Sequence, residues 1–277
     1  MAIYIRTRII ILLALFAMAT SCVYAQKSNK SKKHQESISV TDITPDPSPR
    51  KPRPDRHPKT LRLPVLSGRG GYVDGDHLHG IDVSHYQGRI NWDLVARDNH
   101  AGYVYLKATE GVKTTDDTYS YNFSECKRVG LKVGSYLFFR PNLSAQTQFE
   151  LFKSVVPTRQ QDLLPLIDAE SIRGVSIGVF QQRLLELCDL LEQEYGVKPL
   201  IYTGRNFYNS NIHGNSRLRE YKYFIAAYMD QQPVLSGDED YVMWQYSASG
   251  SVSGIRGNVD MSRFVGRHTI NEILYKP

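Results

Sequence analysis

Two acidic side chains at the end of an apolar segment are the clearest chemical signal in this sequence. Asp168 and Glu170 follow residues 163–167, which are apolar enough to form a buried strand. Because side chains alternate along a strand, both carboxyl groups point to one face, with Cα atoms about 6.6 Å apart. Their repulsion raises one pKa and keeps one acid protonated beside an ionised neighbour. Hydrolysis of a glycosidic bond uses this arrangement; a helix-capping Asp beside an incidental surface Glu is the alternative.

Apolar and amphipathic segments alternate after residue 72 and predict how these acids are positioned. Strands are expected at residues 80–83, 103–107, 132–138, 164–168, 199–202, 223–228, 241–246 and 259–264. Helices are expected at residues 93–99, 118–129, 145–155 and 179–195. Five strand–helix units followed by three plain strands predict an α/β fold, a TIM-like barrel whose last third has lost its helices. A flavodoxin-like open sheet is the structural alternative.

Further acids and aromatic residues fall at strand positions that would share one mouth of such a barrel. Asp82 ends the first strand and Asp260 lies in the last, and these two strands become neighbours when the barrel closes. Five aromatic side chains are expected at the same mouth: Tyr136, Tyr202, Tyr228, Trp244 and Tyr246. Aromatic walls above an acidic floor suit sugars, whose ring faces stack while their hydroxyl groups form hydrogen bonds. Core packing is the alternative for any single tyrosine.

The N-terminal quarter has a different composition. Arg6 and Arg8 precede an apolar run of about twelve residues and then small residues, which predicts an export signal over residues 1–25 and a periplasmic or secreted protein. A bacterial lipoprotein signal ending before Cys22, which would anchor the protein in a membrane, is the second possibility, and an uncleaved anchor is the third. Residues 26–71, rich in Pro, Lys and Arg, are predicted to be a disordered linker. Residues 72–277 are long enough for one domain.

The distribution of charge and the spacing of the cysteines indicate which kinds of ligand the protein could bind. Residues 27–62 carry ten Lys or Arg against four Asp or Glu, whereas the chain from Leu63 onward has a net charge of −2. The basic pI therefore does not indicate nucleic-acid binding, although the basic segment could attract anionic envelope polymers or lipid head groups. Cys126 and Cys188 lack the spacing of a zinc site and are expected to be buried thiols. We expect a monomer without a metal or an organic cofactor.

Short motifs along residues 80–264 resemble, in order, those of the family 25 glycoside hydrolases, the muramidases called Chalaropsis-type lysozymes. They are GIDVS (80–84) with YQG (86–88) and Trp92, KATEG (107–111), GSY (134–136), FFRP (138–141), IDAE (167–170), PLIYT (199–203), IAAY (225–228), WQYS (244–247), and Gly254-Ile255 with Val259-Asp260. Each motif alone is weak, but the ordered set is specific. The sequence departs from the family at Leu137, where a His is common; by alternation, Leu137 should face away from the mouth.

The resemblance implies an irregular (β/α)5(β)3 barrel that cleaves the β-1,4 bond between N-acetylmuramic acid and N-acetylglucosamine in peptidoglycan, with retention of configuration. Glu170 matches the general acid/base of the family, Asp168 the carboxylate beside it, and Asp82 and Asp260 complete the acidic floor. Asp168 would be either a nucleophile or the group that stabilises a substrate-assisted intermediate.

Two other functions fit parts of the pattern. A non-catalytic peptidoglycan-binding domain could retain the fold, but it would not need a costly acid pair. A chitin-directed glycosidase is the other alternative; related barrels carry a longer run of acids, whereas the residues before Asp168 here are apolar.

Overall fold

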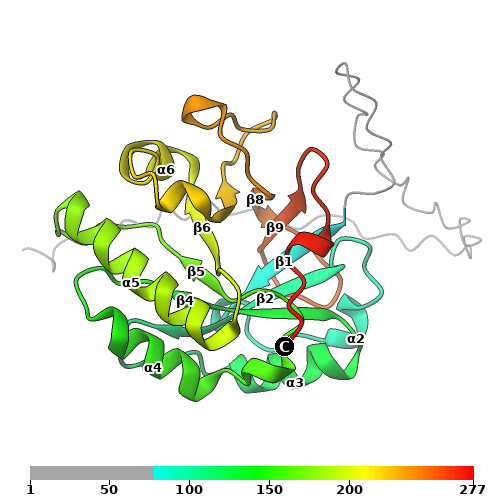
Figure 1. Cartoon of the computed structure of the whole chain (residues 1–277). Helices are drawn as coiled ribbons and strands as arrows, with labels where there is room; N and C mark the ends of the chain where they lie inside the picture. Colours follow the sequence, from blue (N-terminus) through cyan, green and yellow to red (C-terminus); the bar gives the residue numbers. More distant parts are fainter. Residues whose placement is uncertain (1–77) are drawn as a thin grey trace, which may run out of the picture. The chain divides into compact units, whose positions relative to one another are not determined.

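The strands form one continuous sheet that closes on itself as a barrel (Figure 1). The computed structural model describes residues 78–277, so the predicted signal (residues 1–25), Cys22 and the linker (residues 26–71) lie outside the described residues. The strands are β1 (His79–Val83), β2 (Tyr103–Glu110), β3 (Thr114–Thr115), β4 (Lys132–Phe138), β5 (Leu166–Asp168), β6 (Leu200–Gly204), β7 (Lys222–Ala226), β8 (Met243–Gly250) and β9 (Val259–Phe264).

Closure of the barrel depends on β1, which pairs with β2 on one side and with β9 on the other. The pairings from β1 through β2, β4, β5, β6 and β7 to β8 are parallel, whereas β9 runs antiparallel to both β8 and β1. The short strand β3 folds back on β2 outside this ring. The predicted eight-stranded α/β barrel is confirmed, with a mixed rather than purely parallel strand arrangement, and the flavodoxin-like open sheet is wrong.

One helix follows each of the first five barrel strands: α2 (Trp92–Val95), α3 (Tyr119–Arg128), α4 (Ala145–Val155), α5 (Ile177–Tyr195) and α6 (Arg205–Asn211). Ser144 and Ser176 cap α4 and α5 with their hydroxyl groups, and Gly196 ends α5 in a left-handed conformation. Helix α2 is shorter than the helix predicted at residues 93–99. Helix α6 was not predicted, because its mainly polar sequence has little apolar periodicity. No helix in residues 78–277 is long and apolar enough to cross a bilayer.

Short 3-10 helices complete the connections between the main elements. They are η1 (His85–Gln87), η2 (Thr158–Gln160), η3 (Leu218–Glu220), η4 (Ser236–Asp238) and η5 (Ile270–Glu272). Outside the barrel, the predicted buried thiols are confirmed, because Cys126 in α3 and Cys188 in α5 are both buried and unbridged.

Two tyrosine rings fill the barrel interior below the mouth. Tyr103 and Tyr105 on β2 are fully buried, and their hydroxyl groups bond to Ser262 Oγ (3.0 Å) and to the Leu164 carbonyl oxygen (3.2 Å). The rings fit because the strand on each side has a glycine opposite. A Cβ at Gly80 would lie 2.1 Å from the Tyr103 ring, and one at Gly134 would lie 2.5 Å from the Tyr105 ring. The interior is therefore a packed core rather than a pore.

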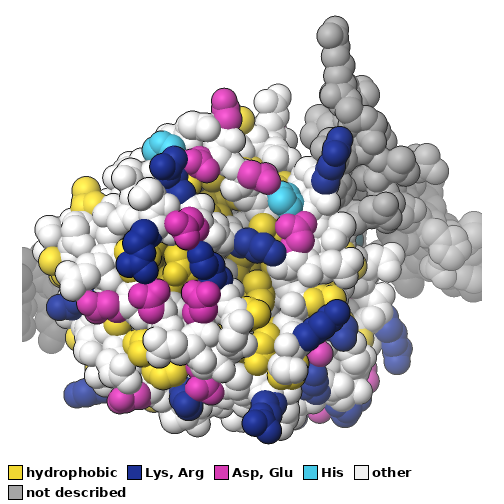
Figure 2. Space-filling model, viewed as in Figure 1, with side chains coloured by type: hydrophobic (Ala, Val, Ile, Leu, Met, Phe, Trp, Pro, Cys, Tyr) yellow, Lys and Arg dark blue, Asp and Glu magenta, His cyan; other side chains and the backbone are white. Residues whose placement is uncertain are grey.

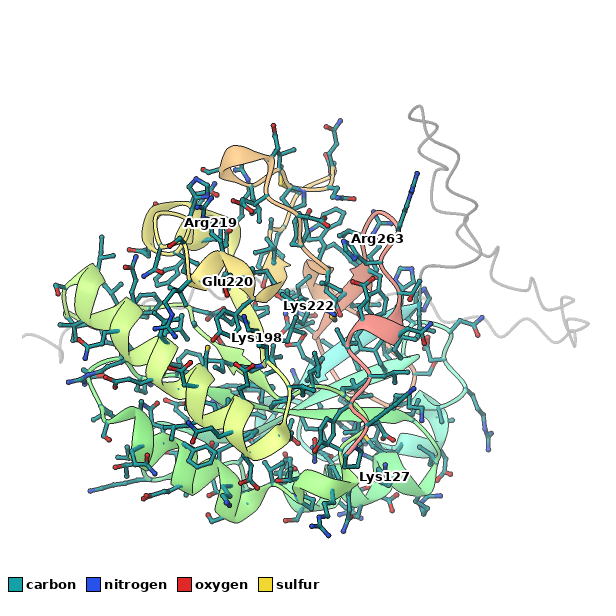
Figure 3. The ribbon with its side chains drawn as sticks, in the orientation of Figure 1. Lys127, Lys198, Arg219, Glu220, Lys222 and Arg263 are labelled. Atoms are coloured by element: carbon teal, nitrogen blue, oxygen red, sulfur yellow. The ribbon has the colours of Figure 1, made fainter. Side chains whose placement is uncertain are left out.

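The end of the barrel at which the parallel strands begin carries charges of both signs. Figure 2 shows Lys, Arg, Asp and Glu interspersed on this face, and Figure 3 labels Lys198, Glu220 and Lys222 close to the starts of β6 and β7. Lys198 pairs with Glu220 at 3.1 Å. Exposed ion pairs of this kind contribute little to stability. The candidate site lies at the opposite mouth of the barrel, where the parallel strands end.

Candidate active site

Four carboxyl groups line one pocket, here called the central pocket, at the C-terminal ends of the parallel strands. Asp82 lies on β1, Asp168 is the last residue of β5, and Glu170 follows two residues later. Asp260 comes from the start of β9, which reaches the same mouth because this strand is antiparallel. The structure therefore brings together all four acids that the sequence analysis selected.

Asp82 and Asp260 lie directly opposite each other in the β1–β9 ladder, as expected from barrel closure. The Gln245 amide nitrogen donates to both carboxyl oxygens of Asp82, at 2.9 and 3.2 Å. Burial raises the pKa of Asp82 well above the usual aspartic acid value, and the charge of Asp260 raises it further. Burial also raises the pKa of Asp260. Such a pair holds protons more tightly than two isolated aspartates would.

Asp168 is the most unusual carboxyl group in the pocket. Its side chain is buried, and its Oδ1 atom has no hydrogen-bond partner within residues 78–277. Burial raises its pKa well above the usual value, and the charges of Glu170 and Asp82 act in the same direction. Lys107 and Arg140 oppose this rise through their positive charges. A buried carboxyl oxygen is costly without a hydrogen-bond partner, so this atom is available to a water molecule or to a polar group of a ligand.

Glu170 has a different environment from Asp168, although both face the pocket. Glu170 is exposed to solvent, whereas Asp168 is 8% exposed. The surrounding protein raises the pKa of Glu170, a hydrogen bond with the Tyr202 hydroxyl lowers it, and the charge of Asp260 raises it. Because water screens an exposed group, the net rise is smaller than for Asp168. The two acids thus combine one buried group with one that can reach a ligand and water.

Aromatic rings form the walls of the central pocket. Of the predicted set, Tyr136, Tyr202 and Tyr228 line it, together with Phe138 on β4 and others. Tyr228 lies beyond the end of β7 and is 61% exposed, so its ring face is open to a ligand. Tyr86, which follows β1 and is 81% exposed, offers a second open ring on the rim. Open rings above a polar floor can stack on sugar faces.

Trp244 and Tyr246 do not line the central pocket, contrary to the sequence-based expectation. They point to the outer face of β8, where the Trp244 indole donates to the Ala227 carbonyl oxygen (2.7 Å) and stacks with Arg263. The Tyr246 hydroxyl bonds to His79 Nδ1 (2.8 Å). Side chains alternate along β8, so the residue between these two aromatics faces the interior instead.

That interior residue is Gln245, which the sequence analysis did not select. Its amide NH2 group donates to Asp82, so its Oε1 atom faces the tyrosines and accepts from the hydroxyl groups of Tyr202 and Tyr228, each at 2.8 Å. The sequence contained a signal for Gln245, because it lies between Trp244 and Tyr246 on a predicted strand. By alternation, either Gln245 or the two aromatic residues must face the barrel interior.

Three further residues that were not predicted, Lys107, Glu110 and Arg140, form a charged cluster at one side of the central pocket. Lys107 lines the pocket and donates to Glu110 at 2.7 Å, and Arg140 also pairs with Glu110. The Arg140 guanidinium lies 4.3 Å from the ring centre of Phe138. Because two cations share the single carboxylate of Glu110, the three side chains together keep a net positive charge. Both cations act electrostatically on Asp168. Leu137, by contrast, is buried and does not line the central pocket, whereas Tyr136 and Phe138 on either side of it do, as alternation predicted.

The dimensions of the central pocket limit what it can enclose. It has a volume of about 280 Å³, near the lower end for ligand pockets, which span about 300–1,000 Å³. A polymer would therefore place only the sugar at the cleavage point inside and lie across the rim on either side. No group of three or more His, Cys, Asp or Glu among the described residues has a metal-binding arrangement.

Acids at the C-terminal mouth of a barrel, walled by aromatic rings, define a glycoside hydrolase site. The family description Glycosyl hydrolases family 25 matches residues 81–255. The chain belongs to this family, and it is a lysozyme-type glycoside hydrolase that acts on peptidoglycan.

One uncharacterized relative and two lysozymes are similar to the chain over most of its length. The chain is 36% identical over 200 residues to the uncharacterized protein YegX of Escherichia coli, covering 71% of this chain and 72% of YegX. It is 31% identical over 208 residues to lysozyme M1 of Streptomyces globisporus, covering 71% and 70%. The crystal structure of a lysozyme from Streptomyces coelicolor superposes with a TM-score of 0.64 at 29% identity, covering 72% of this chain and 96% of that one.

Proposed function

We propose that the protein cleaves the β-1,4 bond between N-acetylmuramic acid and N-acetylglucosamine with retention of configuration. The observation that carries the proposal is the contrast between Asp168 and Glu170, one buried with an unpartnered oxygen and one exposed at the pocket. A retaining glycosidase needs both a group that stabilises positive charge at the anomeric carbon and a group that exchanges protons with the leaving oxygen and water.

Glu170 is the general acid/base in this proposal. It protonates the glycosidic oxygen as the bond breaks and then takes a proton from the incoming water. Asp168 and Glu170 titrate as a coupled pair. Without substrate, burial raises the pKa of Asp168 more than that of Glu170, so the proposal requires substrate binding to shift the proton from Asp168 to Glu170. The cations Lys107 and Arg140 favour this shift by stabilising ionised Asp168, and solvent and the leaving group can reach Glu170.

Asp168 stabilises the positive charge that develops during cleavage. We favour a substrate-assisted route, in which the 2-acetamido group of the sugar attacks its own anomeric carbon while Asp168 orients the acetamide N–H. That N–H would satisfy the unpartnered Oδ1 atom of Asp168. Direct attack by Asp168 on the anomeric carbon is the alternative. Asp82 and Asp260, held together by the β1–β9 pairing, form the floor below the sugar.

The new reducing ends identify the bond that is cleaved. Peptidoglycan digested with the purified protein should release muropeptides with reducing N-acetylmuramic acid ends, measured by mass spectrometry after borohydride reduction. Reducing N-acetylglucosamine ends would contradict the proposed bond. Faster hydrolysis of chitin oligomers than of peptidoglycan would favour the chitin-directed alternative.

Gln245 is a positioning residue, because its Oε1 atom competes with Glu170 for the Tyr202 hydroxyl proton. When Glu170 is protonated, Tyr202 can donate to Gln245 and accept from Glu170; when Glu170 is ionised, Tyr202 can turn and donate to it. Gln245→Met removes the competing acceptor, so Tyr202 donates to ionised Glu170 and lowers its pKa. We expect kcat to fall about 10- to 100-fold and the alkaline limb of the pH–kcat profile to move to lower pH.

Tyr202→Phe is the matched variant for this prediction. It removes the donor from ionised Glu170, so the pKa of Glu170 rises and the alkaline limb moves to higher pH. Opposite shifts in the two variants cannot result from a general loss of packing. Unchanged pH profiles in both variants would show that Gln245 has no such role.

We also propose that the protein is exported. Its substrate lies outside the cytoplasmic membrane, which supports the signal predicted for residues 1–25. N-terminal sequencing and mass measurement of the mature protein would distinguish cleavage after Ala25 from acylation at Cys22, and an uncleaved cytoplasmic protein would contradict export.

A further inference from the structure

A second hollow, here called the side pocket, adjoins the central pocket on the β2–β4 side. Its charged lining residues are Glu110, Lys113, Arg140 and Arg173, three cations and one carboxylate. The Lys107–Glu110 ion pair (2.7 Å) forms the wall between the two pockets, because Lys107 lines the central pocket and Glu110 lines the side pocket. A ligand in the central pocket can therefore extend into the side pocket over this wall.

The positive charge of the side pocket is not neutralised by the protein. Glu110 already pairs with Lys107 and Arg140. Lys113 and Arg173 are exposed, and neither forms an ion pair with any residue in the described part of the chain. This differs from the face in Figures 2 and 3, where exposed cations such as Lys198 have acidic partners. An anionic ligand would satisfy both free cations.

Arg173 is held close to the catalytic acids by its loop. It lies three residues after Glu170, in the connection between β5 and α5. Its backbone is in the left-handed region (φ 47°), and its amide donates to Ser171 Oγ at 3.2 Å. The loop bends sharply here, since Gly174 also has a positive φ of 76°. Arg173 therefore lies in the same short loop as Glu170.

The other hollow that adjoins the central pocket carries less positive charge. It shares Tyr86 and Gln87 with the central pocket and is lined by two arginines, Arg89 and Arg256, and by two acids, Asp93 and Glu125. Both acids also pair with Arg128, which leaves one cation in excess here, against three in the side pocket when Lys107 is counted. The glycan of peptidoglycan carries no charge where its lactyl groups are amide-linked, whereas the attached peptide stems carry free carboxylates. A neutral sugar chain suits the less charged hollow, and an anionic stem suits the side pocket.

We infer that the side pocket binds the carboxylates of the peptide stem attached to the N-acetylmuramic acid at the cleavage point, with Lys113 and Arg173 as the recognising cations. The inference rests on the proposed function, which places that sugar beside Asp168 and Glu170. It assigns stem recognition to the β2–β3 turn and to the loop after β5, and it makes the charge of the stem a determinant of substrate affinity.

The test compares two substrates that differ only in stem charge. Soluble peptidoglycan fragments, freed of phosphate polymers, are used either with free stem carboxylates or after conversion of these groups to amides with carbodiimide and excess ammonia. The full chain is compared with the double variant Lys113→Gln/Arg173→Gln. We expect the KM of the variant to rise roughly 3- to 30-fold on free-carboxylate fragments, the loss for two exposed ion pairs, with kcat nearly unchanged and no difference on amidated fragments.

Two further measurements make the outcome decisive. Added salt should raise the KM of the parent protein on free-carboxylate fragments and not on amidated ones. The control variant Arg267→Gln/Lys276→Gln, which removes two exposed cations that line none of these hollows, should behave as the parent does. An unchanged KM for the side-pocket variant, or an equal loss on both substrates, would overturn the inference. A loss seen only with walls that retain phosphate polymers would identify phosphate as the ligand instead. Cleavage by the parent protein reports on the proposed function separately.

Discussion

Glu170→Gln is expected to lower kcat by about 10³- to 10⁴-fold and to leave KM close to that of the parent protein. Glutamine has nearly the same shape but cannot donate a proton to the glycosidic oxygen or accept one from water, and proton transfer of this kind contributes about 10²- to 10⁴-fold. Glu170 is exposed at the pocket, so the substitution leaves no buried charge unpaired. Initial rates of reducing-end release, together with sedimentation of the variant with sacculi, would measure both effects.

A matched control separates the role of Glu170 from a general effect of removing a carboxylate. Glu186→Gln changes an exposed glutamate on the outer surface of α5 and should retain parental activity. A Glu170→Gln variant as active as this control would refute the assignment of Glu170. The pKa of Glu170 is raised, so the parent enzyme should also remain active above the usual titration range of a glutamic acid, with activity lost at higher pH as the proton leaves.

Asp168→Asn is expected to lower kcat by about 10²- to 10³-fold, because it removes the charge that stabilises the positive transition state. The size of the loss bears on the role of Asp168, since a nucleophile replaced by an amide should lose almost all turnover. Intact-protein mass spectrometry of the parent enzyme during turnover of a slow substrate gives a second criterion. A glycosyl adduct on Asp168 would contradict the substrate-assisted route.

The same variant should be more stable than the parent protein at neutral pH. Burial raises the pKa of Asp168 above that of an unfolded aspartate, so the folded state binds this proton more tightly than the unfolded state does. The parent protein therefore loses stability as the pH rises from the usual aspartate pKa through the raised value. The variant cannot ionise at this position. Its melting temperature should exceed that of the parent at pH 7, and the difference should shrink at low pH.

The sequence predicted the barrel and its acids because both follow from strong local patterns. Apolar strands ending in Asp or Glu establish which residues reach the mouth, and closure then brings Asp82 beside Asp260. The aromatic residues of β8 were misplaced because alternation shows that Trp244 and Tyr246 share a face but not which face that is. Only the bonds of Gln245 to Asp82 and Tyr202 determine the direction.

Other parts of the site depend on contacts between segments and were not predicted. The pairing of Glu110 with Lys107 has a helical spacing, but it forms at the end of a strand, and Arg140 joins it from another strand end. The free cations Lys113 and Arg173 belong to different loops, so their proximity follows from strand order rather than from any sequence motif. The sequence pattern therefore located the acids that perform the chemistry more reliably than the residues around them.

The antiparallel closing strand has a consequence for folding. Asp82 and Asp260 are paired across 178 residues, among the most distant contacts in the barrel, and contacts of such long range form slowly because the entropy of closing the loop opposes them. The acidic floor is therefore completed only when the last strand docks against the first. A chain still being synthesised, or truncated before Val259, lacks both the closed barrel and the partner of Asp82, so hydrolytic activity is delayed until the whole domain has folded.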